Sequence, residues 1–213
     1  MSENYPEAEE LNMVPPSSDI LNRSVQPVLE SEIETDDIQA IIDGMLDVAR
    51  GEQGNPQRPT MVGLAAPQLG IDKRIVVIGI DAVGMGEEPE FKAFINPEIV
   101  SLSPETNLFR EGCYSTSRVC GIVERADRAE VRAFDRNGNA VLETFTGFQA
   151  RILQHEVDHL DGIRFPDRIT DDERLFWVEE SDFGDFREHW QDWPHTVSRA
   201  DWEAIKTGKP PIK

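Results

Sequence analysis

The segment Gln154–Gly162 reads QHEVDHLDG and places His155 and His159 four residues apart, with Glu156 between them. Residues i and i+4 of an α-helix lie on one face, about 5–6 Å apart at Cβ, so both imidazoles can reach one metal ion. Glu156 would project beside them, where its carboxylate can take a proton from a water molecule that the ion activates. The segment therefore predicts the metal-binding helix of a metal-dependent amide hydrolase. A chance pattern on a solvated helix face is the alternative.

The sequence on both sides of this segment predicts an α+β fold with mostly antiparallel strands. Apolar residues at helical spacing predict an N-terminal helix from about residue 35 to residue 50. Strands are expected at residues 74–80, 91–95, 130–134 and 141–145. The last two flank an Asn-Gly turn and should form a hairpin. From Gly147 the spacing becomes helical again, so the histidines lie on a helix in the C-terminal half of the chain.

The length of 213 residues favours one domain with appended segments. We expect a mobile acidic N-terminal tail over residues 1–18, because this stretch has few large apolar side chains. The domain that carries the histidine helix should span residues 19–170. An acidic, Trp-bearing C-terminal extension follows over residues 171–213.

Charge and hydropathy exclude some classes of partner. The formal net charge of −20 repels nucleic-acid backbones and anionic membranes, so neither is expected to bind directly through bulk charge. No stretch reaches the roughly 18 apolar residues of a membrane helix, and the acidic N-terminus does not resemble a secretory signal. We therefore expect a cytoplasmic protein in which Cys113 and Cys120 are reduced thiols.

A hydrolytic metal site needs a third protein ligand and one open position, and three candidates can supply that ligand. One extended form of the pattern ends in a histidine six residues after His159, but Phe165 stands there and excludes it. Glu179 or Glu180 could supply a carboxylate, which would make the protein a zinc peptidase. A cysteine thiolate upstream is the third candidate.

Three blocks in one order indicate which family the sequence resembles. GLAAPQ at Gly63–Gln68, EGCYS at Glu111–Ser115 and QHEVDHLDG together resemble peptide deformylase, the metal-dependent hydrolase that removes the formyl group from N-terminal formyl-methionine of nascent peptides. The likeness extends over about Pro27 to Ile169. It implies an enzyme that acts on N-formylmethionyl nascent peptides. A related fold that only binds N-terminal peptides, without turnover, is the alternative.

The resemblance implies a complete set of metal ligands. Cys113, His155 and His159 would hold one divalent ion per chain, natively Fe²⁺, with Zn²⁺, Ni²⁺ or Co²⁺ able to replace it. A thiolate with two imidazoles suits a divalent ion of borderline softness. These three residues therefore become the expected metal site.

The resemblance also implies the catalytic residues around the ion. Glu156 would act as general base and then as general acid toward the departing amine. The side-chain amide of Gln68 and the backbone N–H of Tyr114 would donate hydrogen bonds to the oxyanion. Arg125 falls where the family has an arginine that pairs with the motif glutamate, here Glu111, and so would be a structural support.

A substrate site follows from the same likeness. The substrate-binding residues that it implies are Val62, Gly63, Phe109, Glu111, Gly112, Phe148 and Ile152. The four apolar members would line the pocket for the methionine side chain, and Gly63 would allow an extended peptide to approach closely. Some relatives dock on the ribosome through a basic C-terminal helix. The acidic segment after residue 170 is unlike that helix, so the ribosome is only a weak candidate partner.

Overall fold

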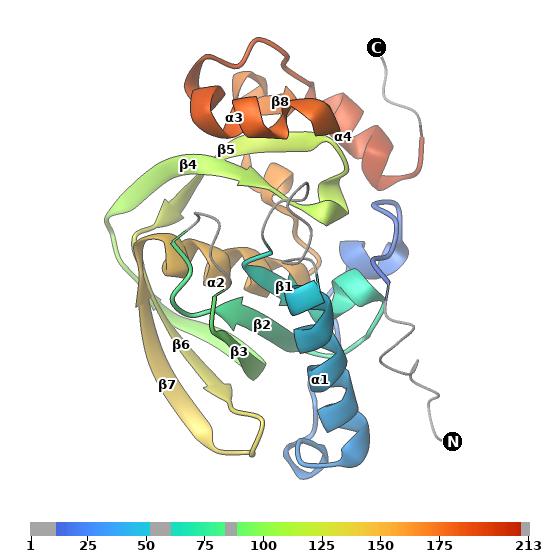
Figure 1. Ribbon diagram of the computed structural model, residues 1–213, viewed down its shortest axis with the longest axis vertical. Helices are drawn as coiled ribbons and strands as arrows, with labels where there is room; N and C mark the ends of the chain where they lie inside the picture. The colour runs from blue at the N-terminus through green and yellow to red at the C-terminus, as the bar shows by residue number, and fades with distance from the viewer. Residues whose placement is uncertain (1–11, 52–60, 84–88, 210–213) are drawn as a thin grey trace.

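The computed structural model describes residues 12–51, 61–83 and 89–209, and within them eight strands form two antiparallel sheets (Figure 1). The first sheet has the order β1-β2-β3-β6-β7, and the second has the order β4-β5-β8. The strands are β1 (Gly63–Ala65), β2 (Ile75–Gly79), β3 (Phe91–Leu102), β4 (Thr106–Gly112), β5 (Val119–Ala126), β6 (Arg128–Phe134), β7 (Ala140–Thr146) and β8 (Leu175–Trp177). The predicted α+β class with antiparallel sheets is confirmed.

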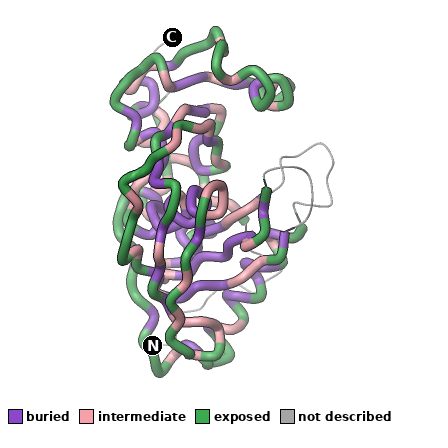
Figure 2. Tube along the Cα trace, turned by 90° about the vertical axis from the view of Figure 1, so that its left-hand side faces the viewer, coloured by how far each residue is buried: buried purple, intermediate pink, exposed green. Residues whose placement is uncertain are grey.

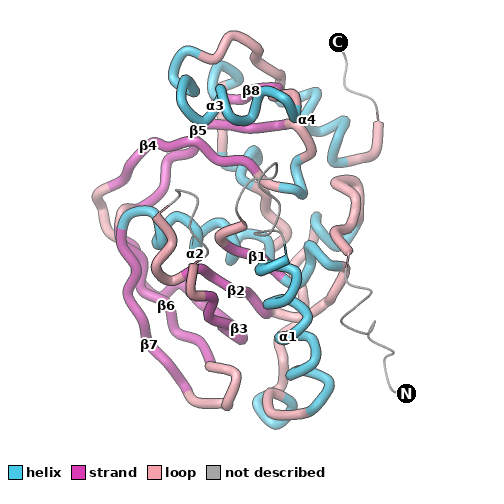
Figure 3. Tube along the Cα trace, viewed as in Figure 1, coloured by secondary structure: helices cyan, strands magenta, loops and turns pink. Residues whose placement is uncertain are grey.

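The N-terminal helix α1 (Asp36–Gly51) confirms the expected helix, with its start one residue later. Its apolar side chains Ile38, Ile41 and Met45 are buried in a cluster with residues of β1 and β2. Burial of one apolar stripe against a sheet is the main source of stability for such a helix. Figure 3 shows α1 lying beside the short strands of the first sheet.

The central helix α2 (Gly147–Leu160) lies between the two sheets and carries both histidines (Figures 1 and 3). Its buried residues Leu153 and Val157 belong to the same cluster as apolar residues of β2, β3 and β6. The helix ends before Gly162, whose φ of 72° favours glycine. A Cβ at Gly162 would also lie 2.5 Å from the backbone nitrogen of Arg23, so only glycine fits there.

The predicted strands are found, but the structure extends and adds to them. β2 matches the expected strand, and β6 and β7 form the predicted hairpin around Gly138. β3 continues to Leu102, well past the expected end at residue 95. The register shifts between Ile95 and Glu98, and Asn96 has a positive φ of 51°, so a bulge interrupts the alternation that defines a strand in sequence. β1, β4, β5 and β8 were not predicted.

The C-terminal extension packs on the second sheet. β8 pairs with β5, placing Phe176 opposite Cys120. Helix α3 (Phe183–His189) lies over this sheet, and α4 (Arg199–Lys206) buries Trp202 fully against residues that include Phe165. Figure 2 shows buried stretches alternating with exposed ones in this C-terminal part. The described residues after residue 170 therefore pack on the rest of the chain. The division into domains stays a prediction.

Most of the predicted N-terminal tail, residues 1–11, lies outside the described residues. Its described end contacts the domain, because the backbone N–H of Val14 donates to the carbonyl of Gln68 at 2.9 Å. The helices of the described part include none that is long and apolar enough to cross a membrane.

Candidate metal centre

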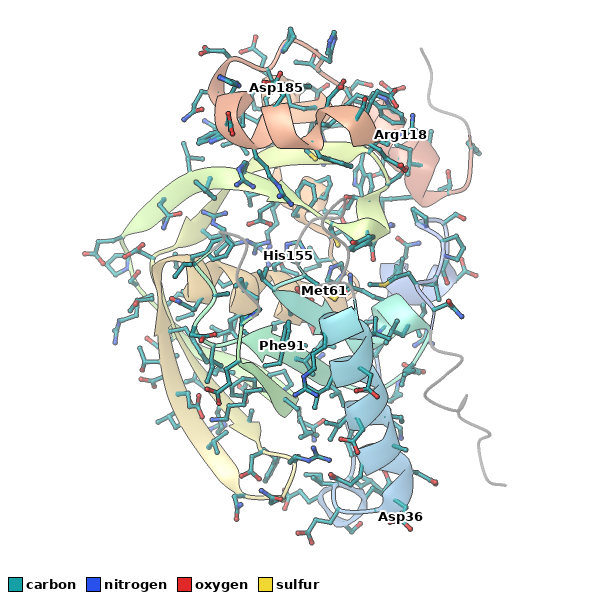
Figure 4. The ribbon with its side chains drawn as sticks, in the orientation of Figure 1. Asp36, Met61, Phe91, Arg118, His155 and Asp185 are labelled. Atoms are coloured by element: carbon teal, nitrogen blue, oxygen red, sulfur yellow. The ribbon has the colours of Figure 1, made fainter. Side chains whose placement is uncertain are left out.

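Two elements bring three metal-ligand side chains together. Cys113 directly follows β4, while His155 and His159 lie one turn apart on α2. The ligand atoms of the three residues all lie within 4.8 Å of one another. Sγ of Cys113 is 3.4 Å from Nε2 of His159, and the two imidazole centroids are 5.0 Å apart. The chain thus places one sulfur and two nitrogen donors around one point. In Figure 4 His155 lies near the middle of the molecule.

The surroundings of these donors fit a divalent metal ion. Oε2 of Glu156 is buried and lacks a hydrogen-bond partner among the described residues. Buried polar atoms normally have partners, so such atoms mark a place where a further group binds. A thiolate with two imidazoles suits Fe²⁺, Zn²⁺, Ni²⁺ or Co²⁺, and three protein ligands leave a position open for chemistry. The residues present therefore fit a catalytic rather than a purely structural metal.

Glu156 lies beside the ligands and against strand β1. Its side chain is buried, and burial raises the pKa of its carboxyl group to about 7. A Cβ on Gly63 would lie 2.6 Å from Oε1 of Glu156 and 2.8 Å from Cγ2 of Ile152. Sequence reasoning assigned Gly63 to the approach of a peptide backbone. The structure adds a second reason for glycine, because this position leaves space for the Glu156 carboxylate.

Gln68 is held so that its amide nitrogen faces the cysteine. It lies in a 3₁₀ turn, η5 (Ala66–Leu69), and its Oε1 accepts a hydrogen bond from the backbone N–H of Ala65 at 2.8 Å. Its Nε2 lies 3.4 Å from Sγ of Cys113 and 3.3 Å from Oγ of Ser115. Because Oε1 is already engaged by the backbone, the orientation of the amide is defined. Tyr114 follows Cys113 at the start of the 3₁₀ turn η6 (Tyr114–Thr116), so its backbone N–H adjoins the ligand.

Glu111 organises the side chains behind the metal ligands. Its carboxylate accepts hydrogen bonds from Nδ1 of His155 at 2.9 Å, from Nε and Nη2 of Arg125 at 2.6 and 2.9 Å, and from Nη1 of Arg151 at 2.7 Å. Burial alone would raise the pKa of Glu111, but the Arg125 charge and the His155 hydrogen bond lower it below its usual range. An ionised Glu111 that engages Nδ1 leaves Nε2 of His155 available for the ion.

This network continues toward the protein surface through residues that sequence reasoning missed. Nη1 of Arg125 donates to Asp158 at 2.8 Å, and Nε of Arg168 donates to the same carboxylate at 2.6 Å. Arg151 was also missed, although its place one turn before His155 on α2 is a signal in the sequence. The contact of Arg168 with Asp158 could not be predicted from helical spacing, because Arg168 lies beyond the end of α2. The predicted pair of Arg125 with Glu111 is present and buried.

The four apolar residues predicted for the methionine pocket are brought together. Ile152 is buried in one cluster with the half-buried Val62 and Phe148. The Phe109 ring meets that of Phe148 at a centroid distance of 6.4 Å. Phe165, which replaces the third histidine of the alternative pattern, stacks on the His155 ring at 6.0 Å. Val62, Phe109, Phe148 and Ile152 together form an apolar wall beside the metal ligands.

The alternative carboxylate ligand lies elsewhere. Glu179 pairs with Arg118 and accepts a hydrogen bond from Nε1 of Trp177 at 2.8 Å, and 48% of its side chain is exposed. It is not among the described side chains that group around the histidines. Cys120 is a free thiol, and burial raises its pKa to about 12. The zinc-peptidase interpretation therefore lacks its third ligand.

Comparisons with known proteins agree with this geometry. The model of the polypeptide deformylase family matches residues 11–175. The peptide deformylase of Leptospira biflexa serovar Patoc is 36% identical over 168 residues, covering 76% of this chain and 89% of that protein. The peptide deformylase of Treponema pallidum subsp. pallidum is 40% identical over 144 residues, covering 68% of this chain and 80% of the relative.

Solved structures give the same result. The class I type b peptide deformylase from Acinetobacter baumannii, in a crystal structure with Met-Ala-Ser bound, superposes with a TM-score of 0.65 at 35% identity, covering 75% of this chain and 98% of that one. The peptide deformylase from Thermotoga maritima gives a TM-score of 0.65 at 30% identity, covering 76% of this chain and 98% of its own. Since the family match spans most of the sequence and the Cys-His-His group is in place, this chain belongs to the peptide deformylase family of metal-dependent hydrolases.

Proposed function

We propose that this peptide deformylase removes the formyl group from N-formylmethionyl nascent peptides, with Glu156 as the proton carrier. The observation that carries the proposal is the buried Glu156 carboxylate, with one oxygen unpartnered, directly beside the Cys113, His155 and His159 donors. A divalent ion bound by these donors would supply a Lewis acid and an activated water. We propose Fe²⁺ as the native ion, while the donor set also suits Zn²⁺, Ni²⁺ and Co²⁺.

Glu156 would move one proton in two steps. It accepts a proton from the attacking water as the water oxygen bonds to the formyl carbon. It then delivers that proton to the amine nitrogen as the carbon–nitrogen bond breaks, which releases formate and a peptide with a free N-terminus. The position of Gly63 supports this role, because it leaves the carboxylate room against β1.

The oxyanion of the tetrahedral intermediate needs fixed donors. We assign these to Nε2 of Gln68 and the backbone N–H of Tyr114. The support for Gln68 is its defined amide orientation toward Cys113. The support for Tyr114 is its position next to the ligand in the chain.

The peptide would bind as an added strand. In the described part of the chain β1 and β4 are each at the edge of a sheet, and they carry Gly63 and the Glu111–Gly112 pair. Edge strands with free backbone groups are the usual acceptors of an extended peptide. The methionine side chain would then enter the apolar wall formed by Val62, Phe109, Phe148 and Ile152. The relative from Acinetobacter baumannii was solved with Met-Ala-Ser, which supports a peptide of this kind as ligand here.

We further propose that the protein acts in the cytoplasm, where it would meet formylated nascent chains. Contact with the ribosome remains the weaker part of the proposal. The extension carries more acidic than basic residues, which disfavours a surface covered with phosphates.

The test is release of formate from formyl-Met-Ala-Ser by protein loaded without oxygen with Fe²⁺, or with Ni²⁺. We expect turnover by the wild-type protein and by Glu180→Gln, an exposed matched control, and a loss of about 10²–10⁴-fold in kcat for Glu156→Gln. Absence of formate at every metal loading would instead favour a protein that binds N-terminal peptides without hydrolysing them.

A further inference from the structure

The extension beyond the family match places an aromatic side chain against the proposed substrate pocket. The match ends at residue 175. The chain that follows runs through α3, which lies over the second sheet on the side away from α2 (Figure 1), and its apolar side chains form a small cluster with residues of β5. Phe176, Val178 and Phe186 are buried there together with Cys120 of β5. Trp190, in the turn after α3, is half-buried at the margin of this cluster.

Trp190 reaches from that outer cluster to the inner side of β4. Its ring lies 5.7 Å from that of Phe109, at an interplanar angle of 67°, which is an edge-to-face contact. Phe109 itself points toward α2, where it meets Phe148 at 6.4 Å. Among the described strands β4 is at the edge of its sheet, which is consistent with a side chain of the extension reaching Phe109 past that edge.

A second contact holds the extension at this place. Nε of Arg110 donates to the backbone carbonyl of Arg187 at 3.2 Å, and the Arg110 guanidinium lies 5.2 Å from the Phe109 ring centroid. The end of α3 is therefore tied to the strand residue next to Phe109. This tie fixes the position from which Trp190 reaches the pocket.

We propose that Trp190 is a specificity-determining residue, which closes the outer side of the methionine pocket by holding Phe109 against Phe148. The inference rests on the proposed function, because Phe109 matters only if that pocket receives the first side chain of the peptide. Trp190 acts through Phe109 and is a positioning residue. With Trp190 in place the pocket suits a slender, unbranched side chain; without it, Phe109 can swing outward and admit a bulkier one.

The experiment compares two peptides on four proteins. The kcat/KM values for formyl-Phe-Ala-Ser and formyl-Met-Ala-Ser are measured for the wild type, Trp190→Ala, Trp190→Phe and Trp193→Ala. Trp193 is the matched control, because it packs on Phe186 at 5.4 Å within the same cluster. We expect the Phe-to-Met ratio to rise about 10-fold or more in Trp190→Ala. The ratio should stay close to wild type in Trp190→Phe and Trp193→Ala.

Calorimetry of the product peptides Phe-Ala-Ser and Met-Ala-Ser tests the same preference without turnover. It gives the ratio of their two binding affinities, which should change in the same direction. A wild type that releases no formate would refute the proposed function, while the product affinities still test Trp190. An unchanged ratio in folded Trp190→Ala, or an equal change in Trp193→Ala, would overturn the inference. If Trp190→Ala unfolds, Trp190→Leu keeps an apolar side chain in the cluster and is subject to the same criteria.

Discussion

Replacing Glu111 by glutamine should weaken both the fold and the metal site. The Glu111 side chain is only 5% exposed and faces two guanidinium groups and the His155 ring. The change keeps the size of the side chain but removes its charge and one acceptor oxygen. Arg125 and Arg151 would then lack their shared counter-charge, although Arg125 keeps its contact with Asp158.

The magnitude follows from this burial. Removing one partner of a buried ion pair costs about 3–5 kcal/mol. In a chain of 213 residues each kcal/mol shifts the melting temperature by about 2–4 °C. We therefore expect Glu111→Gln to melt roughly 6–20 °C lower. Loss of the group that orients a metal-ligating histidine should also weaken metal affinity by about 10–100-fold.

The assay combines thermal unfolding of the metal-free protein with chelator competition for the bound ion. Glu98→Gln is the matched control, since it makes the same chemical change in an exposed pair with Arg132, where 63% and 64% of the two side chains are accessible. Such a pair contributes less than about 1 kcal/mol. If Glu111→Gln matched Glu98→Gln in melting temperature and in metal affinity, Glu111 would not organise the site.

Three further changes test other parts of the site and the fold. Gly63→Ala should lower kcat about 100-fold, because its Cβ would displace the Glu156 carboxylate; Gly184→Ala, with no atom within 4 Å of its Cβ, should leave formate release unchanged. Gln68→Ala should lower kcat by about 10²–10³-fold with metal content retained. A smaller loss of kcat would contradict the assignment of the Gln68 amide as an oxyanion donor. Asp167→Asn should destabilise the protein at pH 7 in urea unfolding, because the carboxylate accepts hydrogen bonds from α4. Burial would raise the pKa of Asp167, but these bonds lower it below its ordinary value of 3.8, so its contribution is present at neutral pH and lost as the pH falls below that value. The difference between variant and wild type should therefore shrink toward pH 3, and a constant difference would contradict this assignment.

The parts of the fold with strong local periodicity could be predicted from sequence. Helical spacing predicts α2, and an Asn-Gly turn between two apolar stretches predicts the β6–β7 hairpin. Each signal lies within about 15 residues of sequence. The spacing of His155 and His159 predicted two metal ligands for the same reason. Cys113 lies about 40 residues upstream, so its part in the site came from resemblance to a family and not from spacing.

The parts that could not be predicted depend on polar residues that face inward. β4 shows no apolar alternation, because Asn107 and Glu111 lie on the same side as Phe109 and bind arginines there. A strand that supports a site with charged side chains therefore looks like a loop in sequence. The link from Asp158 to Arg168 joins two elements through their tertiary arrangement alone. The contact of Trp190 with Phe109 depends in the same way on how the extension packs.

The central claim is that Cys113 completes the metal site with His155 and His159. The most direct test is metal content per chain, measured together with formate release, for the wild type, Cys113→Ala and Glu179→Ala. We predict one ion per chain and full turnover in the wild type and in Glu179→Ala, and loss of both in Cys113→Ala. Retention of metal and turnover in Cys113→Ala, with loss of both in Glu179→Ala, would contradict the claim.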